Sequence, residues 1–182
     1  MRPRPDYAQA LRETGLLELL RPFDPHVAGT PPLGIDLPSS DIDILCHAPD
    51  QIAFTQAVWS NLAASEAFSM HQWTGDPRPV VVGLIAQGWH FELFASPHPV
   101  AEQEGWRHFL AERRLLVLGG EPLRMRIMQH RLAGLKTEPA FAAALNLAGD
   151  PYQALLDLQQ RANRDLAAIL SAAGYPISPE EI

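Results

Sequence analysis

The sequence has little cysteine, few basic residues and no long apolar run. Its one cysteine, Cys46, excludes an intrachain disulfide and a cysteine zinc cluster, and it fits a reducing compartment. No apolar run approaches the roughly 20 residues of a membrane-spanning helix. We therefore expect a cytoplasmic protein that does not enter a membrane.

The charge balance is acidic, with 14 basic and 21 acidic residues and a formal net charge of −7. A domain that binds nucleic acid generally shows a basic excess. The balance therefore favours a small molecule or a protein as partner over DNA or RNA. The sequence does not indicate an oligomeric state.

The composition is that of a folded domain, because 47% of the 182 residues are hydrophobic and 19% are charged. The pattern changes near residues 97–99, from mixed strands and helices to helices alone. We expect an α+β fold with a mixed sheet, in which residues 1–97 form the α/β core and residues 98–182 form a helical part packed on it.

Hydrophobic periodicity and turn residues predict the individual elements. Strands are expected over residues 26–28, 42–47, 69–73, 80–85 and 89–94. Helices are expected over residues 6–20, 50–67, 100–118, 122–135, 138–147 and 151–173.

The segment from Gly29 to Leu45 carries the most chemistry. Asp41 and Asp43 stand two residues apart at the start of an apolar strand, so their side chains share one face. Two neighbouring anions repel each other unless a cation lies between them, and a divalent metal is the usual one. The Gly29-Thr30 turn offers backbone N–H groups that suit a phosphate.

A third carboxylate, Glu92, lies in the apolar strand over residues 89–94, where a charge is costly. Together with Asp41 and Asp43 it could hold one or two Mg²⁺ ions, which prefer oxygen ligands. The alternative is a structural salt bridge between Glu92 and an arginine.

These residues resemble the signature of the nucleotidyltransferase superfamily, which is a Gly-Ser pair, a loop and an Asp-x-Asp strand. Here Gly29-Thr30 precedes Asp41 and Asp43, and Ser40 stands where small members of the superfamily carry a Ser-Asp pair. Thr30 departs from the usual serine but keeps the hydroxyl. The resemblance implies that Gly29, Thr30 and Ser40 contact the nucleotide phosphates.

The chain is also similar to a bacterial family of unknown function within that superfamily, through blocks at residues 29–43, 91–113 and 134–141. The resemblance implies a nucleotidyltransferase-like fold and Mg²⁺-dependent transfer of a nucleoside monophosphate from an NTP to a small-molecule or protein acceptor. It leaves a second reading open, a non-catalytic nucleotide sensor or a partner-binding protein such as a toxin–antitoxin component.

Two cations outside the acidic strands are candidate nucleotide contacts. Arg107 lies one helical turn after Gln103, and both could face the nucleotide. Lys136 precedes a helix that begins near Thr137, where a cation and a helix N-terminus could meet a triphosphate. The alternative for Lys136 is a solvated side chain beside a capped helix.

A further set of residues shares one face of the helix over residues 100–118. Glu104, His108 and Glu112 have the spacing of metal ligands, but pairing along a solvated helix face is the more ordinary reading.

Overall fold

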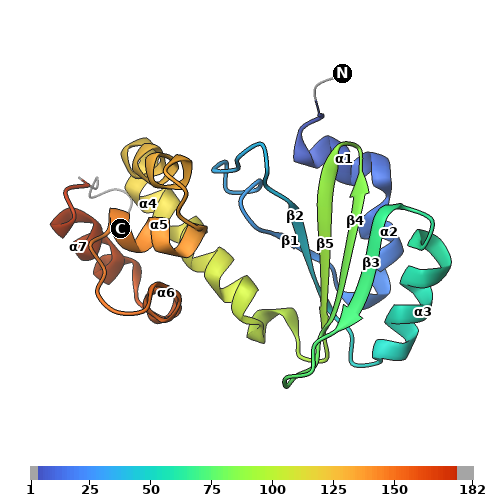
Figure 1. The fold of residues 1–182 in the computed structure, drawn as a ribbon. Coiled ribbons are helices and arrows are strands. Elements are labelled where there is room, and N and C mark those ends of the chain that lie inside the picture. The colour runs from blue at the N-terminus through green and yellow to red at the C-terminus, as the bar shows by residue number, and fades with distance from the viewer. Residues whose placement is uncertain (1–3, 176–182) are drawn as a thin grey trace. The chain divides into compact units, whose positions relative to one another are not determined.

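The computed structural model describes residues 4–175, which form two compact units (Figure 1). The first unit comprises residues 4–32 and 38–106, and the second comprises residues 33–37 and 107–175. The predicted division into residues 1–97 and 98–182 stays a prediction.

The first unit is built on a mixed five-stranded sheet with strand order β1-β2-β5-β4-β3. β2 and β5 are parallel, and the other neighbouring pairs are antiparallel. The strands are β1 (His26–Ala28), β2 (Ile42–His47), β3 (Glu66–Gln72), β4 (Val80–Ala86) and β5 (Trp89–Ser96). All five predicted strands are confirmed, and β3 begins earlier than expected.

One face of the sheet is covered by helices and forms the hydrophobic core. The covering helices are α1 (Tyr7–Thr14), α2 (Leu16–Leu20) and α3 (Gln51–Leu62), with a 3-10 turn, η1 (Arg21–Phe23), after α2. Fully buried Phe54 and Val58 of α3 and Ile44 of β2 belong to this core. Each such side chain stabilises the fold by about 1.5–3 kcal/mol relative to exposure.

Local chain geometry explains where these helices begin and end. Gly15, with φ of 65°, separates α1 from α2, so the helix predicted over residues 6–20 is in fact two. The carboxylate of Asp50 accepts hydrogen bonds from the amides of Ile52 and Ala53 and thereby caps α3. The prediction that this helix continues to residue 67 is wrong, because the chain turns there to begin β3 as the sheet edge.

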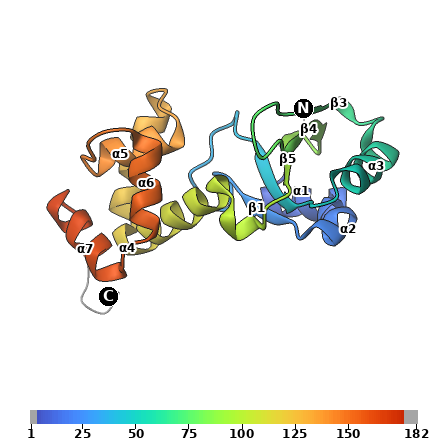
Figure 2. The same cartoon turned by 90° about the horizontal axis from the view of Figure 1, so that it is seen from below.

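The second unit is helical (Figure 2). After a 3-10 turn, η2 (Val100–Glu102), the helices are α4 (Glu104–Leu132), α5 (Thr137–Ala144), α6 (Pro151–Gln159) and α7 (Asn163–Ala172), and α4 starts in the first unit. Gly120, with φ of 58° and ψ of −156°, breaks α4 before Pro122, which confirms the two helices predicted there. The single helix predicted over residues 151–173 is wrong, because the chain breaks it after Gln159.

The guanidinium of Arg114 stabilises that break. Its nitrogens donate to the carbonyl oxygens of Gln159 and Arg161 and to the side chain of Asn163, each at 2.8 Å. A cation at the end of α6 satisfies carbonyl groups that have no partner within the helix.

Across residues 4–175, no helix combines the length and the apolar character that crossing a membrane requires.

Candidate functional site

The acidic residues lie on the face of the sheet opposite the helix-covered core. Ile42 and Ile44 are fully buried in that core, so strand alternation turns Asp43 to the other face. Asp43 is the register partner of Glu92 on the neighbouring parallel strand, which places both side chains on the same face. Asp41 stands two residues before Asp43 and is exposed.

One row of register partners crosses all five strands at this point. It is made of Ala28, Asp43, Glu92, Gly83 and Ser69. The two carboxylates are therefore central in the sheet. One side of the row leads to the turn after β1, and the other side leads to β4 and β3.

The turn after β1 is in immediate contact with Asp43. Gly29 has φ of 77°, a backbone conformation that side chains rarely adopt. A Cβ atom at position 29 would lie 2.2 Å from Asp43 Oδ2 and 3.1 Å from its Cγ. Only glycine therefore allows the backbone of this turn to approach the carboxylate so closely.

The two hydroxyl residues that flank the connecting loop also meet. Thr30 Oγ1 donates a hydrogen bond to Ser40 Oγ at 3.1 Å, and Ser40 is buried. Arg4 donates to the carbonyl oxygen of Pro38 at 2.8 Å and lies over the ring of Trp89, 3.4 Å from its centroid. The structure thus brings Gly29, Thr30 and Ser40 to the acidic end of β2, and it fixes the chain just before Asp41.

The surroundings of Glu92 on the acidic face disfavour its negative charge. Partial desolvation, followed by the negative charge of Asp41, raises the pKa of Glu92 above its ordinary value, while His71 acts in the opposite direction. Within the described part of the sheet unit, Glu92 makes no ion pair with an arginine. The structural salt bridge considered for Glu92 is therefore not found there.

A magnesium ion suits this donor set. The residues offer carboxylate oxygens, the ligands that Mg²⁺ prefers, and their mutual repulsion is what a cation relieves. Among residues 4–175, no three His, Cys, Asp or Glu side chains stand close enough to form a complete ligand group by themselves. Mg²⁺ usually takes only one or two carboxylates and fills its shell with water and substrate phosphates, so a pair suffices. The three-carboxylate site stays a prediction.

The two predicted cationic contacts belong to the second unit. Arg107 is half-buried on α4, and Lys136 is exposed immediately before α5. Thr137 is the first residue of α5 and not its cap, and its hydroxyl oxygen accepts a hydrogen bond from Arg131. The roles of Arg107 and Lys136 toward a nucleotide stay predictions.

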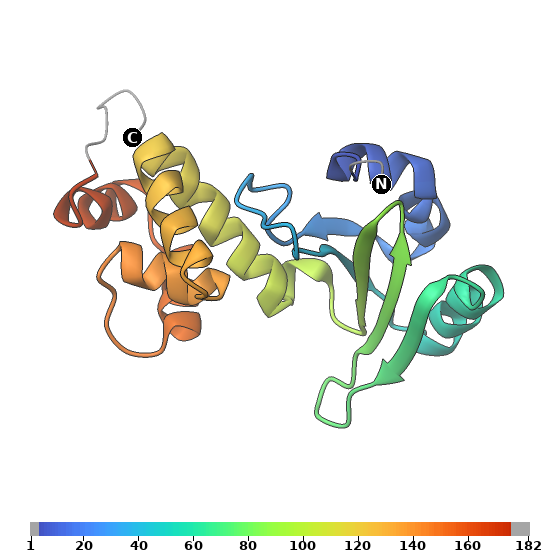
Figure 3. The same cartoon turned by 45° about the horizontal axis from the view of Figure 1, so that its top comes forward.

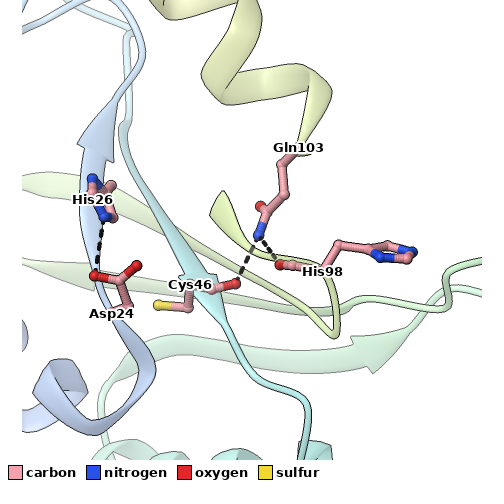
Figure 4. A network of polar contacts seen from close by, with 5 residues as sticks. All are labelled: Asp24, His26, Cys46, His98 and Gln103. Atoms are coloured by element: carbon pink, nitrogen blue, oxygen red, sulfur yellow. Dashed lines mark hydrogen bonds and ion pairs between the residues drawn. The ribbon is translucent and has the colours of Figure 1, made fainter. Parts of the chain in front are cut away.

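The structure corrects the expectation that Gln103 faces a nucleotide. Gln103 is 6% exposed, and its Nε2 donates to the carbonyl oxygens of Cys46 and His98, each at 3.0 Å (Figure 4). It joins the end of β2 to the segment after β5. Its amide is therefore a structural group of the first unit.

The prediction of a solvated helix face at Glu104, His108 and Glu112 is wrong for two of these residues. His108 is 8% exposed and Glu112 is 4% exposed, so both are buried, whereas Glu104 is exposed. Nor do these residues form a three-ligand metal group in the part of the chain that the structure describes. Sequence spacing cannot distinguish the two cases, since the partners that bury a helix face are remote in the chain.

Sequence reasoning missed four residues that share the face of Glu92. Gly83 lies beside it in the register, and Ser69, His71 and Trp73 alternate along β3 and just beyond it. The available signal was a glycine inside an otherwise β-branched and apolar strand, which marks a bulge or a close approach.

Comparison with solved structures finds the fold of nucleotidyltransferase polymerases. The chain is similar to the Cid1 poly(U) polymerase with Mg and 3′-dATP bound, at 13% identity and a TM-score of 0.52, over 84% of this chain and 49% of that one. It is similar to a chain of the GLD-2/RNP-8 complex, at 11% identity and a TM-score of 0.51, over 76% of this chain and 58% of that one. This chain thus spans about half the length of these relatives, and the likeness shows the fold.

The α+β, nucleotidyltransferase-like fold expected from the sequence is therefore confirmed. No curated protein sequence matches the chain. Residues 9–158 match one sequence family, and the chain belongs to that family, described as "Domain of unknown function (DUF4269)".

Proposed function

We propose that this protein catalyses Mg²⁺-dependent transfer of a nucleoside monophosphate from an NTP to a small-molecule or protein acceptor. The observation that carries the proposal is the contact between Gly29 and the Asp43 carboxylate, on the face that also holds Glu92. It places a glycine turn, whose backbone N–H groups suit a phosphate, beside a carboxylate that would hold the metal. The structural relative Cid1 carries Mg and 3′-dATP, which supports the choice of ligand.

Each residue of the acidic face has a distinct role in this proposal. Asp41 and Asp43 would hold the metal through oxygen atoms, Glu92 would add a carboxylate beside the acceptor, and Gly29 and Thr30 would present the turn to the triphosphate. When bound, Mg²⁺ offsets the negative charge that develops on the phosphates as the phosphorus–oxygen bond breaks and pyrophosphate leaves. The protein's part is to fix the phosphates and the acceptor oxygen in line.

The buried hydroxyl of Ser40 positions Thr30 through the hydrogen bond between them. The net charge of −7 favours an acceptor other than nucleic acid, although one of the structural relatives is named as a poly(U) polymerase.

Transfer is tested with NTPs labelled at the α-phosphate. The protein is incubated with ATP, CTP, GTP and UTP in turn, with Mg²⁺ or with EDTA, and a panel of hydroxyl-bearing small molecules. We expect release of pyrophosphate and label on an acceptor or on the protein, with Mg²⁺ only. Asp41→Asn should abolish both signals. Glu18→Gln is the control and should leave both unchanged, because Glu18 is an exposed acid on α2 that pairs with Arg21.

A nucleotide sensor that catalyses no transfer is the second candidate. It is favoured by the separation of the acidic side chains, since no three of them form a ready ligand group among the described residues. Tight Mg²⁺-dependent NTP binding without pyrophosphate release across the panel would establish the sensor. Absence of both NTP binding and metal binding contradicts both functions.

A further inference from the structure

The acidic face continues past Glu92 onto β4 and β3. In the register, Glu92 lies beside Gly83, and Gly83 lies beside Ser69. The next residues on the same face of β3 and beyond are His71 and Trp73, both exposed. We call Ser69, His71, Trp73 and Gly83 the β3–β4 strip.

Gly83 carries no side chain, and the hydroxyl of Ser69 occupies the space over it. A glycine inside a strand weakens it, because it adds chain entropy and removes a packing side chain. A Cβ at position 83 would meet Ser69 Oγ at 2.9 Å, so the Ser69 hydroxyl lies over this position. No side chain therefore separates the Ser69 hydroxyl from the neighbouring Glu92.

An aromatic surface lies further along the same face. The ring of Trp73 meets Phe94 edge to face, with centroids 5.5 Å apart, and Trp73 is nevertheless 51% exposed. Its backbone amide donates to the carbonyl oxygen of Pro79 at 3.0 Å, which fixes the residue at the start of the turn that extends past the sheet (Figure 3). A fixed, exposed indole beside polar groups offers a stacking surface to a flat or ring-shaped ligand.

The charge of the sheet restricts which ligand fits. None of the five described strands contains lysine or arginine, and the titratable residues on this face are acids and histidines. A phosphate on the ligand would meet the carboxylates of Asp43 and Glu92 without a cation from the sheet. A neutral or positively charged ligand meets no such repulsion.

The direction of the reaction places the acceptor on this side. In the proposed function the triphosphate contacts the Gly29-Thr30 turn, on the β1 side of Asp43. Phosphoryl transfer proceeds in line, so the attacking oxygen stands opposite the leaving pyrophosphate. Glu92 and Gly83 lie along the same row of register partners, on the other side of Asp43 from the β1 turn.

From these observations we propose that the β3–β4 strip binds the acceptor, and that the acceptor is a neutral or cationic ring compound with hydroxyl groups, such as a sugar or an amino sugar. The inference rests on the proposed function. The ring of the acceptor stacks on Trp73. Ser69 and His71 bind hydroxyl groups of the acceptor, and one further hydroxyl points toward Glu92. The transfer then forms an oxygen–phosphorus bond, releases pyrophosphate and frees the hydroxyl proton to solvent or to a carboxylate.

Saturation-transfer NMR tests this inference with defined probes. Glucose, glucosamine, glucose 6-phosphate and the trinucleotide UUU are each added to the full chain in the presence of Mg²⁺ and ATP. We expect saturation of the glucosamine and glucose protons, and a weaker signal by about fivefold or more in Trp73→Ala. Gly83→Val puts the side chain of a residue that strands favour where the Ser69 hydroxyl lies, and it should lower the signal similarly.

Trp59→Ala is the matched control. Trp59 is also an exposed tryptophan, at 59%, in an edge-to-face pair with Phe68, but it lies on α3, away from the acidic face. The inference is overturned if neither sugar is saturated, if Trp59→Ala and Trp73→Ala weaken the signal equally, or if UUU is the probe that depends on Trp73. Mg²⁺-dependent ATP binding is measured on the same samples. Its retention when sugar binding is absent overturns the strip alone, whereas its absence from the unmodified protein overturns the proposed function together with the acceptor role.

Discussion

The backbone of Gly29 lies against the carboxylate of Asp43, so closely that a Cβ at position 29 would stand 2.2 Å from Asp43 Oδ2. Gly29 directly follows the short strand β1, and Asp43 is the register partner of Ala28, the last residue of that strand. The turn and the acid are therefore fixed to each other by strand pairing. This relationship is the basis for the first prediction.

Gly29→Ala should weaken Mg²⁺-dependent nucleotide binding, because the new methyl group displaces the Asp43 carboxylate. It should also destabilise the fold by about 1–2 kcal/mol, since alanine at positive φ is strained. Isothermal titration with Mg²⁺ and ATP and urea denaturation measure the two effects separately.

Gly15→Ala separates strain from displacement. Gly15 has φ of 65°, and a Cβ there would meet nothing within 4 Å. We expect a similar loss of stability and unchanged nucleotide binding. If Gly15→Ala weakens nucleotide binding as much as Gly29→Ala does, the contact with Asp43 is not the cause.

Glu92→Gln should reduce transfer about a hundredfold while it leaves most of the nucleotide binding in place. The change removes one negative charge next to the proposed acceptor oxygen but keeps the size of the side chain. The matched control is His90→Gln, because His90 is exposed two residues earlier on the same face of β5. Equal transfer rates for the two variants would remove Glu92 from the site.

Gln103→Met should destabilise the protein by about 1–3 kcal/mol, because the carbonyl oxygens of Cys46 and His98 lose a buried donor. Gln153→Met serves as control, since Gln153 is exposed and bonds only to Asp157 within its own helix. Urea denaturation at constant pH gives both free energies of unfolding. A change of the same size in the two variants would show that the buried position has no special weight.

Cys46 should be almost unreactive in the folded protein. Burial, with a smaller effect from the charge of Asp24, raises the pKa of this thiol from 9.0 to about 12. Because the thiolate is the reactive form, we expect slow reaction with a disulfide reagent at pH 8 and fast reaction in denaturing urea.

The same shift has a defined effect on stability. The unfolded chain ionises this thiol as pH rises through 9.0, whereas the folded chain keeps its proton until about 12. The contribution of Cys46 to stability is therefore complete below pH 9.0 and declines as the pH rises above that value.

The reactivity of Cys46 tests its burial directly. Equal rates of reaction with the disulfide reagent at pH 8, with and without urea, would contradict the burial of this thiol.

Local rules were enough to predict the acidic face. Alternation of apolar and polar residues around Asp43 and Glu92 places both acids away from the core, and the observed register shows them adjacent. The strand ends followed from turn residues such as Gly29. These features depend only on neighbouring residues, which the sequence states directly.

Features that depend on remote partners could not be predicted in this way. Contacts between distant segments give rise to the burial of Glu112, the hydrogen bond from Gln103 to the carbonyl oxygen of Cys46 and the alignment of Ser69 with Glu92. The break after Gln159 is likewise stabilised by Arg114, which lies on another helix. Periodicity alone gives no signal for any of these.

The most direct test of the central claim is nucleotide binding to the acidic face, measured by isothermal titration with ATP, CTP, GTP and UTP in turn. With Mg²⁺ we expect at least one NTP to bind the unmodified protein and Glu18→Gln equally, and to bind Asp43→Asn at least about tenfold more weakly. With EDTA we expect that binding to disappear. Binding that is equally strong in EDTA or in Asp43→Asn, or no binding of any NTP, would contradict a metal–nucleotide site at Asp41, Asp43 and Glu92.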